Sequence, residues 1–290
     1  MSGLKELRSR IGSIKTTRQV TSAMKMVSAA KLKKAQDTFI HFRPYAKSFD
    51  KILFSVLAGM DNLEDIKYIS SKAPENILVV LISSNRGLCG GFNSSVTNFA
   101  LNTVRSDFNK QFRNKKVSFL AVGKQGERLL KNHKILVSGQ KNDVFGNLTY
   151  ENAAEIATGL IRDFTDGVYD RIELVYNEFI NAAQYVQRRE IFLPLQISPD
   201  QRISGDTIFE PSKTEILEDM IPWALKILFY KALIFSFAAE HGARMTAMHQ
   251  ATDNATELLG ELSLQYNKAR QAAITGEILE ITGGAEALRK

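Results

Sequence analysis

The sequence predicts an α/β protein in which a small Rossmann-like domain is inserted between two long terminal helices that form an antiparallel coiled coil. Both ends of the chain show helical periodicity with few proline residues. The middle of the chain alternates between apolar runs of strand length and amphipathic helical patterns. We therefore expect a shaft helix over residues 1–60, a central α/β domain over residues 73–199 and a second shaft helix over residues 213–290.

The N-terminal helix carries an apolar seam at intervals of three and four residues, which is typical of a helix that packs along one partner. The seam begins at Leu4, Leu7, Ile11 and Ile14. In strict register it then meets Arg18, Thr21, Lys25 and Ser28 before apolar residues return at Leu32. A neighbouring stripe of Val20, Met24 and Val27 offers apolar contacts over the same stretch. We therefore expect the seam to slip onto that stripe, and we expect Pro44 to kink the helix rather than end it.

The central domain is predicted from the alternation of strands and helices. Continuous apolar runs over residues 77–82, 117–122 and 172–180 are typical of strands covered on both faces, and residues 186–195 form a partly alternating fourth run. Helical patterns over residues 96–112, 125–131 and 150–165 lie between them. This order predicts a mostly parallel sheet.

The C-terminal helix has a seam that is rich in small residues, which let two helices approach closely. We expect this seam to consist of Ala255, Leu258, Leu262, Gln265, Ala269, Ala272, Gly276 and Leu279. The longest apolar stretch, residues 223–239, is interrupted by Lys226 and Lys231. Two lysines within a membrane span are costly, so we expect a buried helix face, no direct membrane span and a soluble protein. The N-terminus has no apolar core of a signal peptide.

The net charge of +7 is unevenly distributed. Residues 1–50 hold 11 Lys and Arg against 3 Asp and Glu, and the rest of the chain is nearly neutral, so the excess positive charge is expected on the first helix. Clustered basic residues are compatible with a nucleic-acid-binding coiled coil. However, the helix has no aromatic residue before Phe39 and its seam implies a partner helix. The charges therefore favour a solvated face, or steering of the rod into an acidic or polar sleeve.

A glycine-rich loop, residues 86–93, follows the first strand and precedes a helix, where nucleotide-binding folds place phosphates. It matches neither of the two common phosphate-binding motifs, and a structural turn is the favoured interpretation. The turn Gly123-Lys124-Gln125-Gly126 is equally compatible with a plain helix start. A dinucleotide-dependent enzyme that uses the loop around Cys89 is the second alternative function.

No catalytic or metal-binding pattern stands out in the chain. The four histidines are scattered, and Cys89 is the only cysteine, so a disulfide within the chain and a cysteine-based zinc site are excluded. We expect no catalytic residue, no cofactor and no metal, and therefore a mechanical rather than an enzymatic role.

Four segments carry a resemblance to a known family. Residues 14–31 (IKTTRQVTSAMKMVSAAK), 85–93 (NRGLCGGFN), 240–254 (EHGARMTAMHQATDN) and 266–274 (YNKARQAAI) resemble the gamma subunit of the F-type ATP synthase. The segments occur in the family's order, and the similarity extends over nearly the whole chain. The resemblance implies a non-catalytic central rotor stalk that couples ion flow through a membrane ring to ATP synthesis or hydrolysis.

The resemblance also implies partners and contact residues. Its partners would be the alpha and beta subunits of the catalytic hexamer, the epsilon subunit and the membrane ring of c subunits, at the cytoplasmic face of a bacterial membrane, with no nucleic acid. Contacts with the beta subunit would be made by Arg270, Gln271, Thr275, Met24 and Lys25. Contacts of the foot with the ring would be made by Thr207, Phe209 and Glu210.

This sequence departs from the family pattern at three positions. Asn85 stands where the family commonly has Asp, His249 replaces a usual Lys, and Gly276 stands where a polar helix former is common. Because glycine inside a helix costs about 1 kcal/mol relative to alanine, we expect a locally softer helix around Gly276.

Overall fold

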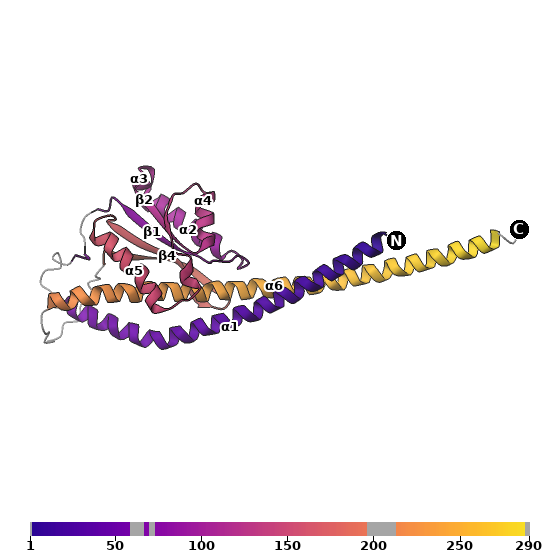
Figure 1. Cartoon of the computed structure of the whole chain (residues 1–290), viewed down its shortest axis with the longest axis horizontal. Coiled ribbons are helices and arrows are strands. Elements are labelled where there is room, and N and C mark those ends of the chain that lie inside the picture. The colour runs from indigo at the N-terminus through magenta and orange to yellow at the C-terminus, as the bar shows by residue number, and fades with distance from the viewer. Residues whose placement is uncertain (1, 59–66, 70–72, 196–212, 288–290) are drawn as a thin grey trace. The chain divides into compact units, whose positions relative to one another are not determined.

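A computed structural model describes residues 2–58, 67–69, 73–195 and 213–287 (Figure 1). Its helices are α1 (Ser2–Ala58), α2 (Phe92–Asp107), α3 (Asn109–Arg113), α4 (Lys124–Asn132), the short 3₁₀ helix η1 (Asp143–Phe145), α5 (Tyr150–Thr165) and α6 (Lys213–Ala287). Its strands are β1 (Ile77–Ile82), β2 (Val117–Val122), β3 (Val137–Gln140), β4 (Arg171–Asn181) and β5 (Gln184–Leu193). The chain divides into two compact units, residues 1–28 with 245–290 and residues 29–244, which are described in turn.

The five strands of the larger unit form one sheet in the order β3-β2-β1-β4-β5. β1 pairs in parallel with both β2 and β4, β2 pairs in parallel with β3, and β5 is antiparallel to β4. The predicted α/β fold class and the mostly parallel sheet are therefore confirmed, and the four parallel strands follow the Rossmann order 3-2-1-4. The antiparallel edge strand arises because β4 and β5 are joined by a tight hairpin at residues 182–183.

The sheet is covered on both faces, which explains why β1 is apolar throughout. Every residue of β1 is buried. Alternate side chains point to opposite faces: Leu78, Val80 and Ile82 pack in a core with α5 and α6. Ile77, Val79 and Leu81 pack in a second core with α2 and α4. Burying such a side chain contributes roughly 1.5–3 kcal/mol, so this strand anchors both layers.

The predicted elements of this unit differ from the observed ones at a few points. β3 and η1 were not predicted, because β3 is four residues long and only half-buried along its length. The single helix expected over residues 96–112 begins earlier, at Phe92, and is interrupted at Phe108, which separates α2 from α3. β1, β2 and α5 have the expected bounds.

In the same unit the second half of α1 lies against the first half of α6 through aromatic contacts. The rings of Phe39 and Phe235 lie 4.5 Å apart, and those of Phe42 and Tyr230 lie 5.3 Å apart. Pro44 lies inside α1, as expected, and Pro222 lies inside α6.

The smaller unit is an antiparallel pair formed by the start of α1 and the end of α6 (Figure 1). The expected slip of the α1 seam is wrong. Thr21 and Ser28 are the buried positions, whereas Val20 and Val27 are more than half exposed. The strict register persists because the hydroxyl groups buried there find hydrogen-bond partners. Ser28 donates to the carbonyl of Met24, and the hydroxyl oxygens of Thr21 and Thr252 lie 2.8 Å apart.

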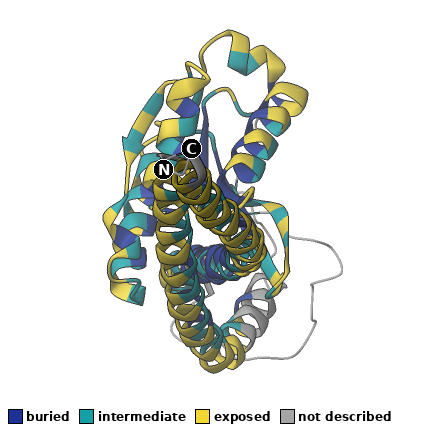
Figure 2. Cartoon of the chain, turned by 90° about the vertical axis from the view of Figure 1, so that its right-hand side faces the viewer, coloured by how far each residue is buried: buried dark blue, intermediate teal, exposed yellow. Residues whose placement is uncertain are grey.

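The α6 seam also differs from the expected one. Gln265, Ala272 and Leu279 are exposed, whereas Tyr266 and Ala273 take the inward positions. The inward residues follow a strict heptad spacing: Met248, Thr252, Ala255, Leu259, Leu262, Tyr266, Ala269, Ala273 and Gly276. The expectation that small residues line this seam is retained. Exposed residues cover most of the two helices towards their free ends (Figure 2).

Among the described residues, one helix, α6, is long enough and contains a sufficiently apolar 18-residue stretch to cross a membrane by length and composition alone. Half of that stretch is buried inside the protein. Part of the apolar stretch is accounted for by packing against the sheet. Leu225, Phe229 and Leu233 belong to the core on the α5 side of β1. This agrees with the expectation of a buried helix face, although Trp223 at its start is half exposed.

Gly276 provides a test of helix softness in the smaller unit. A side chain added there would meet no neighbouring atom within 4 Å, and the same holds for Gly260. We expect Gly276→Ala to stabilise α6 locally by about 1 kcal/mol and to slow amide hydrogen exchange around residue 276. Gly260→Ala is the matched control and should slow exchange only around residue 260. Exchange around Gly276 in the unsubstituted chain that is no faster than around Leu262 would contradict the expected softness.

Candidate functional site

The loop between β1 and α2 is held in shape by buried polar side chains. The side-chain oxygen of Asn93 accepts from the N–H of Ser84 at 2.9 Å, and its amide nitrogen donates to the Ser84 hydroxyl and to the Cys89 sulfur at 2.8 and 3.2 Å. The Ser84 hydroxyl donates to the carbonyl of Arg86 at 2.6 Å. Leu88 and Gly90 have positive φ angles, so the chain folds back tightly between these residues.

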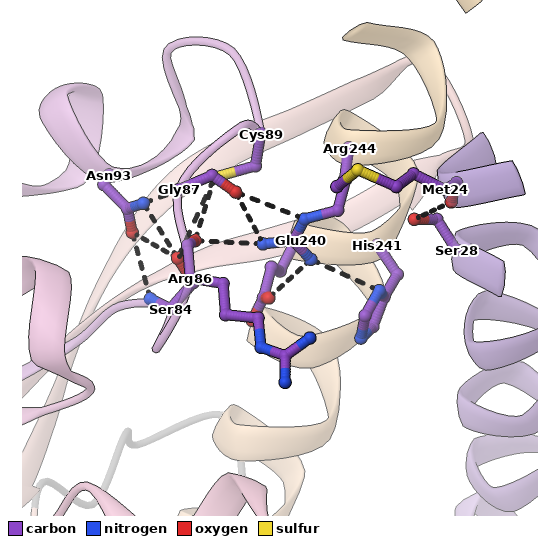
Figure 3. Close-up of polar contacts among 10 residues, drawn as sticks. All are labelled: Met24, Ser28, Ser84, Arg86, Gly87, Cys89, Asn93, Glu240, His241 and Arg244. Atoms are coloured by element: carbon purple, nitrogen blue, oxygen red, sulfur yellow. Dashed lines mark hydrogen bonds and ion pairs between the residues drawn. The ribbon is translucent and has the colours of Figure 1, made fainter. Parts of the chain in front are cut away.

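Arg244 of α6 clasps this loop from the side (Figure 3). Its Nη2 donates to the carbonyls of Arg86 and Gly87 at 3.0 and 3.2 Å. Its Nη1 donates to Oε1 of Glu240, one turn earlier on α6, at 2.6 Å. Arg244 and Glu240 are both buried. The guanidinium therefore joins the loop to α6 by charge-assisted hydrogen bonds in a buried site.

Burial raises the pKa of Glu240, and the neighbouring Arg244 opposes that rise. A carboxylate this deep in the protein remains charged only because a cation is held beside it. We refer to Arg244, Glu240 and the carbonyls of Arg86 and Gly87 as the clasp.

His241 forms the inner wall of the clasp. Its ring stands edge-on to Phe237 at 4.5 Å between centroids, and its Nδ1 lies 3.4 Å from Nη1 of Arg244. Because a guanidinium can only donate, this contact requires a neutral ring with its proton on Nε2. Burial, Arg244 and Lys31 lower the pKa of His241 to about 3. The imidazole is therefore neutral at physiological pH.

A second close approach ties the same part of α6 to the sheet. A side chain at Gly242 would lie 3.1 Å from the carbonyl oxygen of Ala182, in the turn between β4 and β5. A side chain at this position would press on the hairpin, which would have to move by a few tenths of an ångström. α6 is thus held by the loop and by the hairpin within a single turn of helix.

The glycine-rich loop does not have the polarity of a phosphate site. It turns the carbonyls of Arg86 and Gly87 toward a cation, whereas phosphate loops turn N–H groups toward an anion. The other glycine turn is also occupied by the chain itself. The N–H groups of Lys124, Gln125 and Gly126 at the start of α4 donate to Asn85 Oδ1, the Ser84 carbonyl and the Ser83 hydroxyl. Both turns are therefore explained by structure.

Cys89 does not have the surroundings of a reactive thiol. It is 1% exposed, and burial raises its pKa, which disfavours the thiolate. Within the described residues there is no group of three or more His, Cys, Asp and Glu side chains that could hold a metal ion.

The residues expected to contact other subunits are distributed over both helices of the smaller unit. Arg270, Gln271 and Thr275 are exposed on α6, and Met24 and Lys25 are half-buried on α1. Thr207, Phe209 and Glu210 lie outside the described residues.

The structure shows the surroundings of two of the three positions that are expected to depart from the family pattern. The Asn85 amide donates to the carbonyl of Asn142 at 2.7 Å while its oxygen accepts from Lys124. An Asp at this position could make only the second contact. His249 lies exposed on α6, where its Nδ1 is 3.2 Å from the carboxylate of Asp253.

Sequence reasoning did not single out Arg244, Glu240 or Asn93 as site residues. A signal was present: Glu240 and Arg244 lie four residues apart directly after a strongly apolar helical stretch. Charged residues are rarely fully buried unless they are paired, so this spacing indicates a buried ion pair on one helix face. The partner loop was not evident, because its contribution consists of backbone carbonyls.

Breaking the clasp tests its contribution to stability. Arg244→Met should lower the free energy of unfolding of the full chain by about 3–5 kcal/mol, because Glu240 is left buried without its cation. The loss should shrink at low pH, where Glu240 takes up a proton, and in the double variant Arg244→Met with Glu240→Gln. Arg270→Met, on the exposed face of α6, is the control, and an equal effect of the two single substitutions would rule out the clasp.

The neutral state of His241 predicts a pH dependence. The unfolded chain protonates this histidine near pH 6.5, but the folded chain does so only near pH 3. Stability should therefore fall as pH drops through this window, by on the order of 3–5 kcal/mol from His241, with Glu240 acting in the opposite direction. Chemical unfolding of the full chain and of His241→Gln at pH 7 and pH 4.5 measures this. An equally steep loss in the variant would contradict the assignment.

The chain is similar to known proteins over nearly its whole length. The family model described as "ATP synthase" matches residues 3–288. The chain is 53% identical to the ATP synthase gamma chain of Flavobacterium johnsoniae over 99% of both chains. It is 43% identical to that of Cytophaga hutchinsonii over 99% of both chains.

Two solved structures are similar to the fold. One is the central stalk and c-ring structure of the Tetrahymena thermophila mitochondrial ATP synthase, with a TM-score of 0.57 and 28% identity over 80% of this chain and 99% of that one. The other is a chain of the Euglena gracilis mitochondrial ATP synthase, with a TM-score of 0.65 and 22% identity over 99% of this chain and 95% of that one, which shows the fold alone. With the family model matching nearly end to end, this chain belongs to the ATP synthase gamma chain family.

Proposed function

We propose that this chain is the central rotor of an F-type ATP synthase. It couples ion flow through a membrane ring to ATP synthesis or hydrolysis at sites on other subunits, and it is not itself a catalyst. The Tetrahymena relative is described as part of a central stalk with a c-ring, and the chain's membership of the gamma chain family makes the same role the first expectation here.

The observation that supports this proposal is the clasp. α6 is one helix from Lys213 to Ala287, and the clasp fastens the sheet domain to it through the loop after β1. Because the contact is buried and charge-assisted, the domain cannot slide along or around this part of α6 without breaking the hydrogen bonds from Arg244 to the carbonyls of Arg86 and Gly87. Such a joint is what a rotor needs in order to carry torque between a shaft and its foot.

The division of labour that we propose follows the helices and the sheet. Residues 1–60 and 213–290 act as the shaft, and residues 73–199 act as the foot. The shaft turns within the hexamer of alpha and beta subunits, and the foot meets the epsilon subunit and the ring of c subunits. The assembly lies at the cytoplasmic face of a bacterial membrane, and nucleic acid is not a partner.

The proposed contacts with the beta subunit are Arg270, Gln271 and Thr275, with Met24 and Lys25 on the other helix. The exposure of the first three on α6 leaves them free to meet another subunit. The proposed contacts with the ring are Thr207, Phe209 and Glu210.

The proposed role as a coupling subunit is tested by ATP hydrolysis of alpha and beta subunits with and without this chain. We expect steady turnover only in the complete mixture and none with the chain alone. Arg270→Ala with Gln271→Ala should reduce turnover severalfold, because two contacts that grip the shaft are lost. Glu261→Ala, an exposed position elsewhere on α6, is the control. Turnover that does not depend on the chain, or hydrolysis by the chain alone, would sink the proposal.

A further inference from the structure

A second concentration of positive charge lies in the sheet domain. Residues 105–141 hold ten Lys and Arg and two Asp and Glu, a net of +8, and all ten basic side chains are exposed. From the sequence alone, we expect the excess positive charge on the first helix. The sheet domain carries a second positively charged segment of the same net charge. The net charge of residues 51–290 is close to zero because acidic residues elsewhere in that range balance this basic segment.

Six of these cations gather at one edge of the sheet. Arg113, Lys115 and Lys116 come directly before β2, and Lys131 and Lys134 come shortly before β3. β2 and β3 are neighbouring parallel strands, so the segments that precede them lie at the same edge. Lys110 of α3 adds the sixth charge. We call this set of six residues the basic edge. It lies at the opposite end of the strands from the clasp, which is formed beyond the carboxyl end of β1.

Most of the basic edge has no counter-charge. Lys116 pairs with Glu75, and Lys131 pairs with Glu127. Among the described residues, Lys110, Arg113, Lys115 and Lys134 have no ion pair. Beside them stands Leu136, whose exposed fraction of 82% is the highest among the large apolar side chains of the described residues.

Two of the free lysines occupy backbone positions that disfavour them. Lys115 and Lys134 have φ angles of 56° and 58°, in the left-handed region. Each lies at the end of a helix, and the residue after it closes that end with the same type of hydrogen bond. The N–H of Lys116 donates to the carbonyl of Gln111, and the N–H of Ile135 donates to the carbonyl of Leu130. Glycine is the favoured residue at this position. Lysine at both positions breaks a local preference without a visible structural gain, which is the pattern expected of a functional surface.

We propose that the basic edge binds the anionic headgroups of a phospholipid surface. Five of its six cations are Lys, which is depleted at protein–protein interfaces, where Arg is enriched. Lysines beside an exposed leucine are instead typical of surfaces that rest on a lipid interface. The orientation toward a membrane rests on the proposed rotor function. A lipid surface is uniform in all directions, so a rotor can keep this contact at every angle, whereas a fixed acidic protein would be met once in each turn.

Vesicle binding by the full chain tests this inference. We expect the chain to partition onto phosphatidylcholine vesicles that contain phosphatidylglycerol, and not onto phosphatidylcholine alone. Lys115→Gly with Lys134→Gly should weaken binding about tenfold or more, since each surface cation contributes to attraction by an anionic leaflet. The same double variant should unfold at the same temperature or a higher one, because glycine fits both positions. A structural role for the two lysines would instead lower the unfolding temperature.

Two further variants make the result decisive. Lys5→Gln with Lys15→Gln removes two exposed charges from α1 and should leave vesicle binding nearly unchanged. Lys110→Gln with Arg113→Gln should weaken vesicle binding as the glycine variant does. This variant provides the test if the glycine variant unfolds at a lower temperature. Loss of binding in the α1 variant alone overturns the proposal. So does the absence of any binding to anionic vesicles, and that result would instead point to an acidic protein surface as the partner of the basic edge. The measurement needs no alpha or beta subunit, so it stands or fails independently of the reconstitution.

Discussion

The buried pair of Arg244 and Glu240 is the constraint on which the arrangement of the larger unit depends. A guanidinium and a carboxylate in the protein interior are tolerated only when every strong hydrogen-bonding group around them is satisfied. Here the guanidinium of Arg244 donates hydrogen bonds to two partners, the carboxylate one turn away and the carbonyls of the loop after β1. Burial and the neighbouring Arg244 keep His241 neutral, while the loop shape rests on Asn93 and Ser84. The same requirement makes the loop a cradle for a cation and so removes it as a phosphate site.

The paired helices of the smaller unit are held together differently. Their seam mixes small and hydroxyl-bearing residues with a few large apolar ones such as Leu262, and the hydroxyls of Thr21 and Ser28 are satisfied by nearby carbonyls or by Thr252. Small seam residues allow close approach but bury little apolar surface, so the pair depends on length rather than on a thick core. Apolar residues such as Val20, Met26 and Val27 stay on the outside. A thin rod with outward apolar residues is suited to work inside a sleeve of other subunits.

Much of the fold could be predicted from the sequence because its strongest signals are local. β1, β2 and α5 were predicted with the right bounds, since continuous apolar runs and helical spacing are set by burial on both faces of a sheet. The seam of α1 was mispredicted because an apolar stripe at Val20 and Val27 competed with a polar one, and periodicity alone cannot weigh hydroxyls that bond to the backbone. β3 was missed because it is short and half-buried. The clasp was missed because half of it is backbone carbonyl, which no side-chain pattern records.

In the rotor that we propose, the foot turns with the shaft because the clasp joins the sheet domain to α6. The most direct measurement is single-molecule rotation in an assembly of alpha, beta and this chain, with a bead attached at an exposed foot position such as Ser106→Cys. With ATP present, we expect one-way rotation of the bead in discrete steps, with a wider angular spread at each pause when Arg244→Met is introduced. ATP hydrolysis with a stationary bead, or an angular spread unchanged by Arg244→Met, would contradict it.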